Sequence, residues 1–240
     1  MMRRLETSEQ IDILEMLFAE NRTSTDQPWV MLNMVSSVDG ATALRGGATS
    51  LNDADDRALF LSLRAVADVV LVGAETVRAE NIGPVKMSKA MSAHREAAGL
   101  TGEPRLAILT RSLNLDVDDR VFADPNRRPI VVTEQGADAQ RLEMIAEVAD
   151  VVVSPLLDGP GIISALGGVQ VILCEGGPTV NSQLIAANLV DEINVTLSPL
   201  FAMGHSKRIA MGDELDPPIE LALDRTLVGD RSLFLRYLRG

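Results

Sequence analysis

Short apolar runs alternate along the chain with stretches in which apolar residues recur at helical spacing. The stretch that begins at Asn52-Asp53 has that spacing, and so do residues 138–147 and 178–188. Strands that alternate with helices predict an α/β fold with a mainly parallel sheet and helices on both faces. Seven apolar runs have the length and composition of buried strands: 29–35, 69–72, 106–109, 130–132, 151–153, 169–173 and 193–197.

The N-terminal end departs from this pattern. Residues 8–20 place four apolar side chains on one face of an expected helix, with Thr7 or Ser8 as its N-cap. A polar linker follows and ends at Pro28. We therefore expect a helix and linker over 1–28 and a single domain over 29–240.

The C-terminal end also differs. Residues 218–227 and 231–238 flank Gly229-Asp230, which predicts an antiparallel hairpin that closes one edge of the sheet. Residues 83–104 have little apolar periodicity, and we interpret them as a long connection, either a surface excursion or a lid.

Composition and charge narrow the class of protein. Of the 240 residues 46% are apolar and 23% charged, which is typical of a globular chain. There are 22 basic and 34 acidic residues, so the net charge is −12. Such a charge repels phosphate backbones and anionic lipids, and it argues against nucleic-acid and membrane partners.

The cysteine count and the absence of long apolar stretches indicate a soluble, cytoplasmic protein. Cys174 is the single cysteine of the sequence, so no internal disulfide forms. Its neighbours are apolar, which predicts a buried and unreactive thiol. No signal-type segment follows the start, and no stretch approaches the roughly 20 apolar residues that span a bilayer.

Two strand ends carry glycines that suit a nucleotide. Gly73 follows one expected strand, with Thr76 three residues later. Glu175-Gly176-Gly177-Pro178-Thr179 follows another, with proline where the first helical residue is expected. Glycine lets a phosphate approach the main chain, and a helix N-terminus offers free N–H groups. Each segment also fits a plain strand-to-helix turn.

Two further strand ends carry hydroxyls and charge. Thr110, Arg111 and Ser112 would suit a 2′-phosphate, because a guanidinium binds phosphate through two nitrogens. The segment Ser36-Ser37-Val38-Asp39-Gly40 fits either a ligand contact or a hydrogen-bonded turn.

The sequence lacks the motifs of several other kinds of active site. The zinc-deaminase signature, the P-loop and the Rossmann glycine fingerprint are all missing from the sequence. His94 and His205 lack the spacing of metal ligands, so we expect no metal site. A dinucleotide would have to bind in another way.

Taken together, the motifs resemble the reductase domain of bacterial riboflavin biosynthesis, the pyrimidine reductase family, and most closely its stand-alone actinobacterial branch. The resemblance covers about residues 29–240, with the motifs in the family's order. They are Asn33-x-x-Ser36-Ser37-x-Asp39-Gly40, Leu63-Arg64-Ala65 through Gly73-x-x-Thr76-Val77, Glu175-Gly176-Gly177-Pro178-Thr179, Leu189-Val190-Asp191-Glu192 and Ser198-Pro199.

This resemblance implies a dihydrofolate-reductase-like fold, NADPH as cofactor, a small-molecule substrate and a homodimer. It implies reduction of the ribose of 5-amino-6-(5-phosphoribosylamino)uracil to a ribityl chain. The residues that it assigns to cofactor binding are Gly73, Thr76, Val77, Thr110, Arg111, Ser112, Gly176, Gly177 and Thr179, with Thr49, Ser50 and Asp53 near the nicotinamide and substrate.

Two departures from the family pattern concern the substrate end. Asn33 stands where the family usually carries a lysine, and Glu80 stands in an altered segment, Glu80-Asn81-Ile82-Gly83-Pro84. We expect Asn33, Glu80 and Glu175 to orient the substrate, and Asp56 to serve as an acid near a helix start.

The leading hypothesis is thus an NADPH-dependent pyrimidine reductase that transfers a hydride. A pterin reductase of the dihydrofolate-reductase type is the second hypothesis. The third is a non-catalytic nucleotide-binding homologue.

Overall fold

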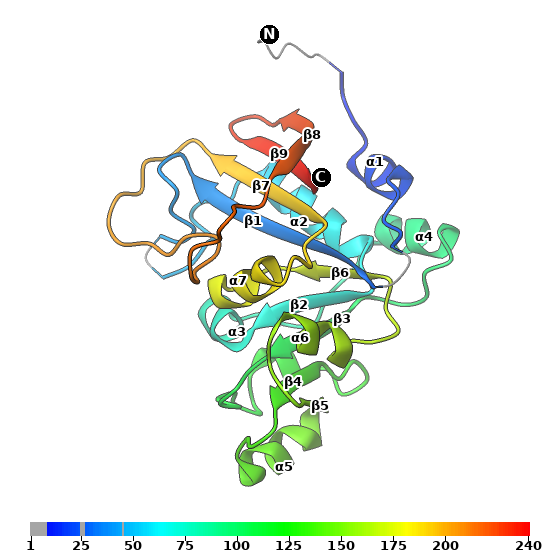
Figure 1. Cartoon of the computed structure of the whole chain (residues 1–240). Helices are drawn as coiled ribbons and strands as arrows, with labels where there is room; N and C mark the ends of the chain where they lie inside the picture. The colour runs from blue at the N-terminus through cyan, green and yellow to red at the C-terminus, as the bar shows by residue number, and fades with distance from the viewer. Residues whose placement is uncertain (1–8, 25–26, 45) are drawn as a thin grey trace.

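A computed structural model describes residues 9–24, 27–44 and 46–240. Nine strands form one sheet in the order β5-β4-β3-β2-β6-β1-β7-β9-β8 (Figure 1). The strands are β1 Trp29–Ser37, β2 Val69–Gly73, β3 Arg105–Leu109, β4 Ile130–Glu134, β5 Asp150–Ser154, β6 Val171–Cys174, β7 Glu192–Ser198, β8 Leu221–Val228 and β9 Leu233–Arg239.

Strands β1 to β7 are parallel, and the C-terminal hairpin β8–β9 adds to β7 in antiparallel fashion. The predicted α/β class, parallel sheet and closing hairpin are confirmed. The seven buried runs became the seven parallel strands because helices cover a parallel sheet on both faces, so its central strands are apolar on both sides.

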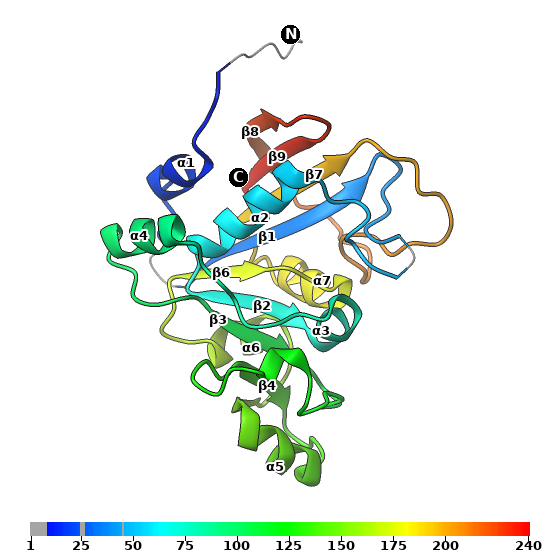
Figure 2. The same cartoon turned by 180° about the vertical axis from the view of Figure 1, so that it is seen from behind.

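Helices cover both faces of the sheet (Figure 2). Leu184 of α7 and Ile162 of α6 pack on one face, against the side chains of Val30, Leu32 and Leu71. The opposite face carries α2, whose Leu59 and Leu63 pack with Met31 and Val70. The helices are α1 Ile13–Ala19, α2 Ala54–Ala65, α3 Ala74–Glu80, α4 Lys89–Ala97, α5 Ala139–Val148, α6 Gly159–Ala165 and α7 Pro178–Ala186, with a 3₁₀ turn at Arg120–Phe122.

The N-terminal helix is shorter than predicted. Helix α1 begins at Ile13 because the Asp12 carboxylate caps it, accepting from the N–H groups of Leu14 and Glu15. The predicted caps, Thr7 and Ser8, lie outside the described residues. The division of the chain at residue 28 stays a prediction.

The expected connection over 83–104 is corrected, because it contains helix α4. Arg95 of α4 is buried and donates to the carbonyl oxygens of Ala65 and Ala67, both at 2.7 Å. These bonds fix α4 against the end of α2.

No described helix has both the length and the apolar character that crossing a bilayer requires.

Candidate active site

The two glycine turns meet at the carboxyl ends of neighbouring strands. The N–H of Gly73 donates to the carbonyl of Gly176 at 2.8 Å, since β2 pairs directly with β6. A Cβ on Gly73 would lie 3.3 Å from the nitrogen of Gly177, and one on Gly177 would lie 3.2 Å from Thr76 Oγ1. Gly176 has φ +91°, a backbone conformation that favours glycine. The juxtaposition expected for a dinucleotide site is present.

A cleft of about 1340 Å³ opens beside these turns. Side chains of α2 and α3 form two of its walls, and the loops after β1 and β7 form the others. The expected site residues that line it are Asn33, Thr49, Ser50, Asp56, Thr76, Glu80, Glu175 and Gly177. One cavity thus collects residues from four distant parts of the sequence.

Asp56 lies in the cleft with only 6% of its surface exposed. Burial raises the pKa of its carboxyl, and the nearby hydroxyl of Thr196 opposes that rise. The Asn52 amide, with its nitrogen turned inward, donates to Asp56 Oδ2 at 3.3 Å. No Lys or Arg among the described residues forms a salt bridge with Asp56. Its oxygens therefore retain capacity to accept hydrogen bonds from a ligand.

Glu175 is differently placed. Arg64 Nε and Nη2 donate to the two oxygens of Glu175, each at 2.6 Å, and the guanidinium lies 4.2 Å from the centre of the Phe60 ring. Both oxygens of Glu175 thus already accept from Arg64. Its carboxylate is therefore better suited to holding Arg64 in place at the cleft wall than to binding a ligand by itself.

Glu80 joins α3 to the loop after β1. Its carboxylate accepts from the N–H of Ala48 at 2.7 Å and from Thr49 Oγ1 at 3.4 Å. Glu80 therefore shapes the wall that Thr49 and Ser50 form.

Eight expected site residues do not line the cleft: Asp53, Gly73, Val77, Thr110, Arg111, Ser112, Gly176 and Thr179. Asp53 caps α2 and accepts from Ser232 Oγ at 2.6 Å, so it ties the helix to the C-terminal hairpin. Val77 is part of the apolar core. Thr179 lies in the first turn of α7, whose N-cap position, Gly177, has no side-chain cap. The N–H groups of that turn are therefore suited to an anion.

The segment expected near a 2′-phosphate follows β3. Thr110 is buried and accepts from the N–H of Leu113. Ser112 accepts from Asn114 N in an exposed turn. Arg111 is held by Glu134 at 3.3 Å and by the carbonyl of Leu157 at 3.0 Å. None of these three residues lines the cleft, although their strand neighbours that of Gly73.

The Ser36–Gly40 turn is structural. The Asp39 carboxylate accepts from Ser37 Oγ and from the N–H groups of Ala202 and Met203. These bonds lower its pKa to about 2. Asp39 thereby fixes the loop after β7 against the loop after β1.

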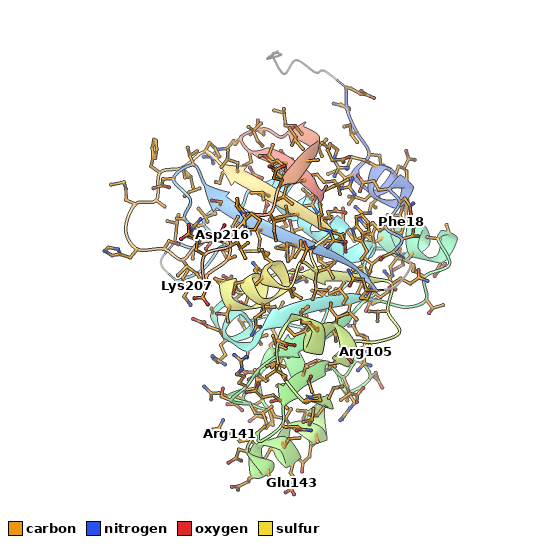
Figure 3. The ribbon with its side chains drawn as sticks, viewed as in Figure 1. Phe18, Arg105, Arg141, Glu143, Lys207 and Asp216 are labelled. Atoms are coloured by element: carbon orange, nitrogen blue, oxygen red, sulfur yellow. The ribbon has the colours of Figure 1, made fainter. Side chains whose placement is uncertain are left out.

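Sequence reasoning missed the basic residues of the cleft, which are Arg57, Arg64, Lys86, Arg120 and Lys207. Lys207 lies in the loop after β7 (Figure 3). It donates to Glu75 at 2.8 Å. Arg57 and Arg64 lie seven residues apart on α2, a spacing that puts both on one helix face. This spacing could have indicated that the two cations lie together in a site. The same spacing is also typical of an ordinary solvent-exposed helix surface.

Cys174 is buried, and burial raises the pKa of its thiol to about 12. The predicted burial of this thiol is confirmed.

Comparison with known proteins adds to this geometry. Residues 28–232 match the family described as RibD C-terminal domain. A relative from Methanothermobacter thermautotrophicus, named 2,5-diamino-6-ribosylamino-4(3H)-pyrimidinone 5′-phosphate reductase, is 26% identical over 88% of this chain and 98% of its own. A protein of the same name from Aquifex aeolicus is 28% identical over 79% of this chain and 84% of its own.

Two solved structures bear on the fold. A pyrimidine reductase-like protein from Corynebacterium diphtheriae superposes with a TM-score of 0.84, at 28% identity over 95% of this chain and 99% of that one. Dihydrofolate reductase from Enterococcus faecalis superposes with a TM-score of 0.53 at 14% identity, over 89% of this chain and 97% of that one. The expected dihydrofolate-reductase-like fold is confirmed.

Proposed function

Because the chain belongs to the RibD C-terminal domain family, we propose that it is an NADPH-dependent reductase of a ribosylaminopyrimidine 5′-phosphate in riboflavin biosynthesis. The observation that carries this proposal is the contact of Gly73 with Gly176-Gly177 at the rim of a large cleft. The relatives named as pyrimidinone 5′-phosphate reductases support the same reaction.

The residues present fit a dinucleotide. Glycine at positions 73 and 177 lets the two turns pack directly against each other beside the cleft, because a Cβ would lie 3.3 Å from Gly177 N and 3.2 Å from Thr76 Oγ1 respectively. Thr76 Oγ1 and the first turn of α7, with Thr179, would donate to the pyrophosphate of the cofactor. Thr110, Arg111 and Ser112, at the end of the adjacent strand, would hold the 2′-phosphate that distinguishes NADPH from NADH.

The substrate would occupy the part of the cleft that carries exposed basic side chains. Arg57, Lys86 and Arg120 line it, and none of them forms a salt bridge within the described residues. In a chain of net charge −12, such cations favour an anionic ligand locally where the overall field opposes it. A substrate that carries a 5′-phosphate meets that requirement.

The residues of this chain would bind and orient the substrate. When bound, the nicotinamide supplies the hydride that converts the ribosyl group to a ribityl chain. Asn33 and Asp56 would hold the pyrimidine, and the Arg64–Glu175 pair would keep the cleft wall in position. Most of the rate enhancement would come from holding the reacting carbons in contact.

The test is direct. NADPH fluorescence is titrated with the protein, and oxidation of NADPH is followed at 340 nm with the ribosylaminopyrimidine 5′-phosphates and with dihydrofolate. We expect NADPH to bind more tightly than NADH and only the ribosylaminopyrimidines to be consumed. Turnover of dihydrofolate alone would favour a pterin reductase, and cofactor binding without any turnover would favour a non-catalytic homologue.

A further inference from the structure

We propose that the turn between β8 and β9, residues 229–232, is a positioning element of the active site, and that Ser232 is its principal positioning residue. The turn holds the first turn of α2, from which Asp56 and Arg57 face the cleft. The inference rests on the proposed function, because that function places the substrate against these two residues.

The side chains at the start of α2 divide between the cleft and the hairpin. Asp56 and Arg57 line the cleft, whereas Asp53 and Asp55 do not. Asp53 is the N-cap, and its Oδ1 accepts from the N–H of Asp56 at 2.8 Å, so its carboxylate fixes the place where the helix begins. A group that holds Asp53 therefore also holds the residues that face the substrate.

Ser232 binds the second oxygen of that carboxylate. Its Oγ donates to Asp53 Oδ2 at 2.6 Å, and only 1% of the Ser232 surface is exposed. Burial raises the pKa of Asp53, but the bonds from Ser232 and from the N–H of Asp56 outweigh burial and lower the pKa. The carboxylate is therefore ionised at neutral pH, and a hydrogen bond to an ionised acceptor is one of the stronger kind. Through its two oxygens, Asp53 joins the helix to the hairpin.

A second contact joins the same two turns. The N–H of Asp230 donates to Asp55 Oδ2 at 2.8 Å. Gly229 lies against this carboxylate, since a Cβ there would lie 2.5 Å from Asp55 Oδ2 and 2.8 Å from the Phe234 ring. The N–H of Gly229 also donates to the carbonyl of Ser232 at 3.0 Å, which closes the turn. The turn is therefore itself well defined and packs closely on α2.

The hairpin connects α2 to the strand that forms another part of the cleft. Directly after Ser232, β9 pairs with β7, beginning with Leu233 opposite Leu197. Strand β7 pairs with β1, which carries Asn33 into the cleft. Ser232 thus helps to set the position of Asp56 and Arg57 relative to Asn33, and a small displacement of a binding group weakens the contact with a substrate.

The experiment removes the hydroxyl and leaves the helix cap in place. In Ser232→Ala we expect KM for 2,5-diamino-6-ribosylamino-4(3H)-pyrimidinone 5′-phosphate to rise about threefold to tenfold, with kcat changed by less than about twofold. The dissociation constant and the stoichiometry of NADPH binding should stay those of the wild-type protein. A purely structural role would instead lower the fraction of protein that binds NADPH, and with it the apparent kcat, at an unchanged KM.

The matched control is Thr226→Val in the same hairpin. Thr226 is half-buried in β8, and in the described part of the chain no side-chain hydrogen bond joins it to α2. This variant should leave KM unchanged. Asp55→Ala removes the second contact and should raise KM about twofold, less than Ser232→Ala because that bond is exposed. It provides the test if Ser232→Ala does not fold. An unchanged KM in a folded Ser232→Ala, or otherwise in Asp55→Ala, overturns the inference, and so does an equal rise in Thr226→Val.

Failure of the proposed function is distinguishable from failure of this inference. If the wild-type protein reduces no ribosylaminopyrimidine 5′-phosphate, hydrogen exchange still tests whether Ser232 holds the start of α2. The amide of Asp56 should exchange about threefold faster or more in Ser232→Ala than in the wild-type protein and in Thr226→Val, while the amides of α7 keep their rates. Unchanged exchange at Asp56 would show that the turn does not position the helix.

Discussion

At the scale of single residues, Glu75 and Lys207 form an ion pair in front of the glycine turns. Glu75 is the second residue of α3, two positions after Gly73 and next to Thr76. The Glu75 carboxylate repels the pyrophosphate that we propose for this site. It also forms an ion pair with Lys207, a cation that could otherwise bind the pyrophosphate. We predict that Glu75→Gln tightens NADPH binding about threefold to tenfold, because exposed charge pairs contribute about 1 kcal/mol. Fluorescence titration measures the change.

Lys207→Gln should weaken NADPH binding by a similar factor, and both effects should shrink in 0.5 M salt because exposed charges are screened. Glu96→Gln, a change on an exposed part of α4, is the control and should have no effect. Weaker NADPH binding by Glu75→Gln would contradict a phosphate at this place.

There is a physical reason why some site residues could be predicted from the sequence and others could not. Gly73 and Gly176-Gly177 follow apolar strands directly, so their place at one sheet edge is predictable from local pattern alone. The occupation of Glu175 by Arg64 is not, because the two residues are 111 positions apart and meet only when α2 packs on the sheet. A strand-end carboxylate therefore looks like a ligand-binding group until its partner is known.

At the scale of elements, α4 is held by a charged side chain. Arg95 donates to two carbonyl oxygens at the end of α2 and to the carbonyl of Gly102 at 2.8 Å. We predict that Arg95→Met lowers the free energy of unfolding by about 2–4 kcal/mol, because it leaves buried carbonyls without donors. Urea denaturation followed by circular dichroism measures this.

Lys89→Met, on the exposed first turn of the same helix, is the matched control and should change stability by less than about 0.5 kcal/mol. Equal stability of the two variants would show that α4 does not depend on Arg95.

The same anchor explains why α4 was missed in the sequence. Periodicity analysis detects helices through apolar faces, and the buried residue of α4 is Arg95. Helix α6 was hidden for another reason, since its first turn reads Gly159-Pro160-Gly161, a composition that indicates a turn. The parallel strands were found because each is an uninterrupted apolar run.

At the scale of the whole molecule, Glu192 joins the N-terminal segment to the sheet. It is fully buried and accepts from Arg22 Nε at 3.1 Å, Trp29 Nε1 at 3.2 Å and Arg236 Nη2 at 2.9 Å. Burial by itself would raise its pKa, but Arg236 and Arg22 outweigh burial and lower the pKa to about 2. A depressed carboxyl pKa stabilises the fold above the unfolded value of 4.5, and that contribution is lost as pH falls toward 2.

We predict that stability declines by roughly 3 kcal/mol across this interval through Glu192 alone. Glu192→Gln should remove that component of the acid dependence and should lower stability at pH 7 by about 3–5 kcal/mol, because two buried guanidinium groups lose their partner. Asp150→Asn, in an exposed ion pair with Arg105 and Arg128, is the control and should cost less than about 1 kcal/mol. Chemical denaturation between pH 3 and 7 measures both. An unchanged acid dependence in Glu192→Gln would contradict the prediction.

The distribution of polar and apolar side chains on the last three strands has a consequence for assembly. Glu192, Asn194, Thr196 and Arg236 are buried on one face, beneath the helices. The opposite face carries Ile193, Val195, Leu197, Leu233, Leu235 and Tyr237, together with the exposed Leu221, Leu223 and Val228. Helices α6 and α7 pack near the middle of the sheet on that side and leave its β8 end without a covering helix (Figure 1).

We propose that a second copy of this chain covers this face. An exposed apolar patch of this kind is typical of an interface, and two chains of charge −12 approach each other favourably only through an uncharged surface.

Light scattering should therefore give about twice the chain mass of 25.8 kDa. Leu223→Glu, at a position 57% exposed, should shift the protein toward the monomer, since it places like charges in the contact. Val153→Glu, at a position 44% exposed on the opposite edge strand, should leave the dimer intact. A wild-type protein that remains at 25.8 kDa at micromolar concentration would show that this apolar face is exposed in the functional molecule.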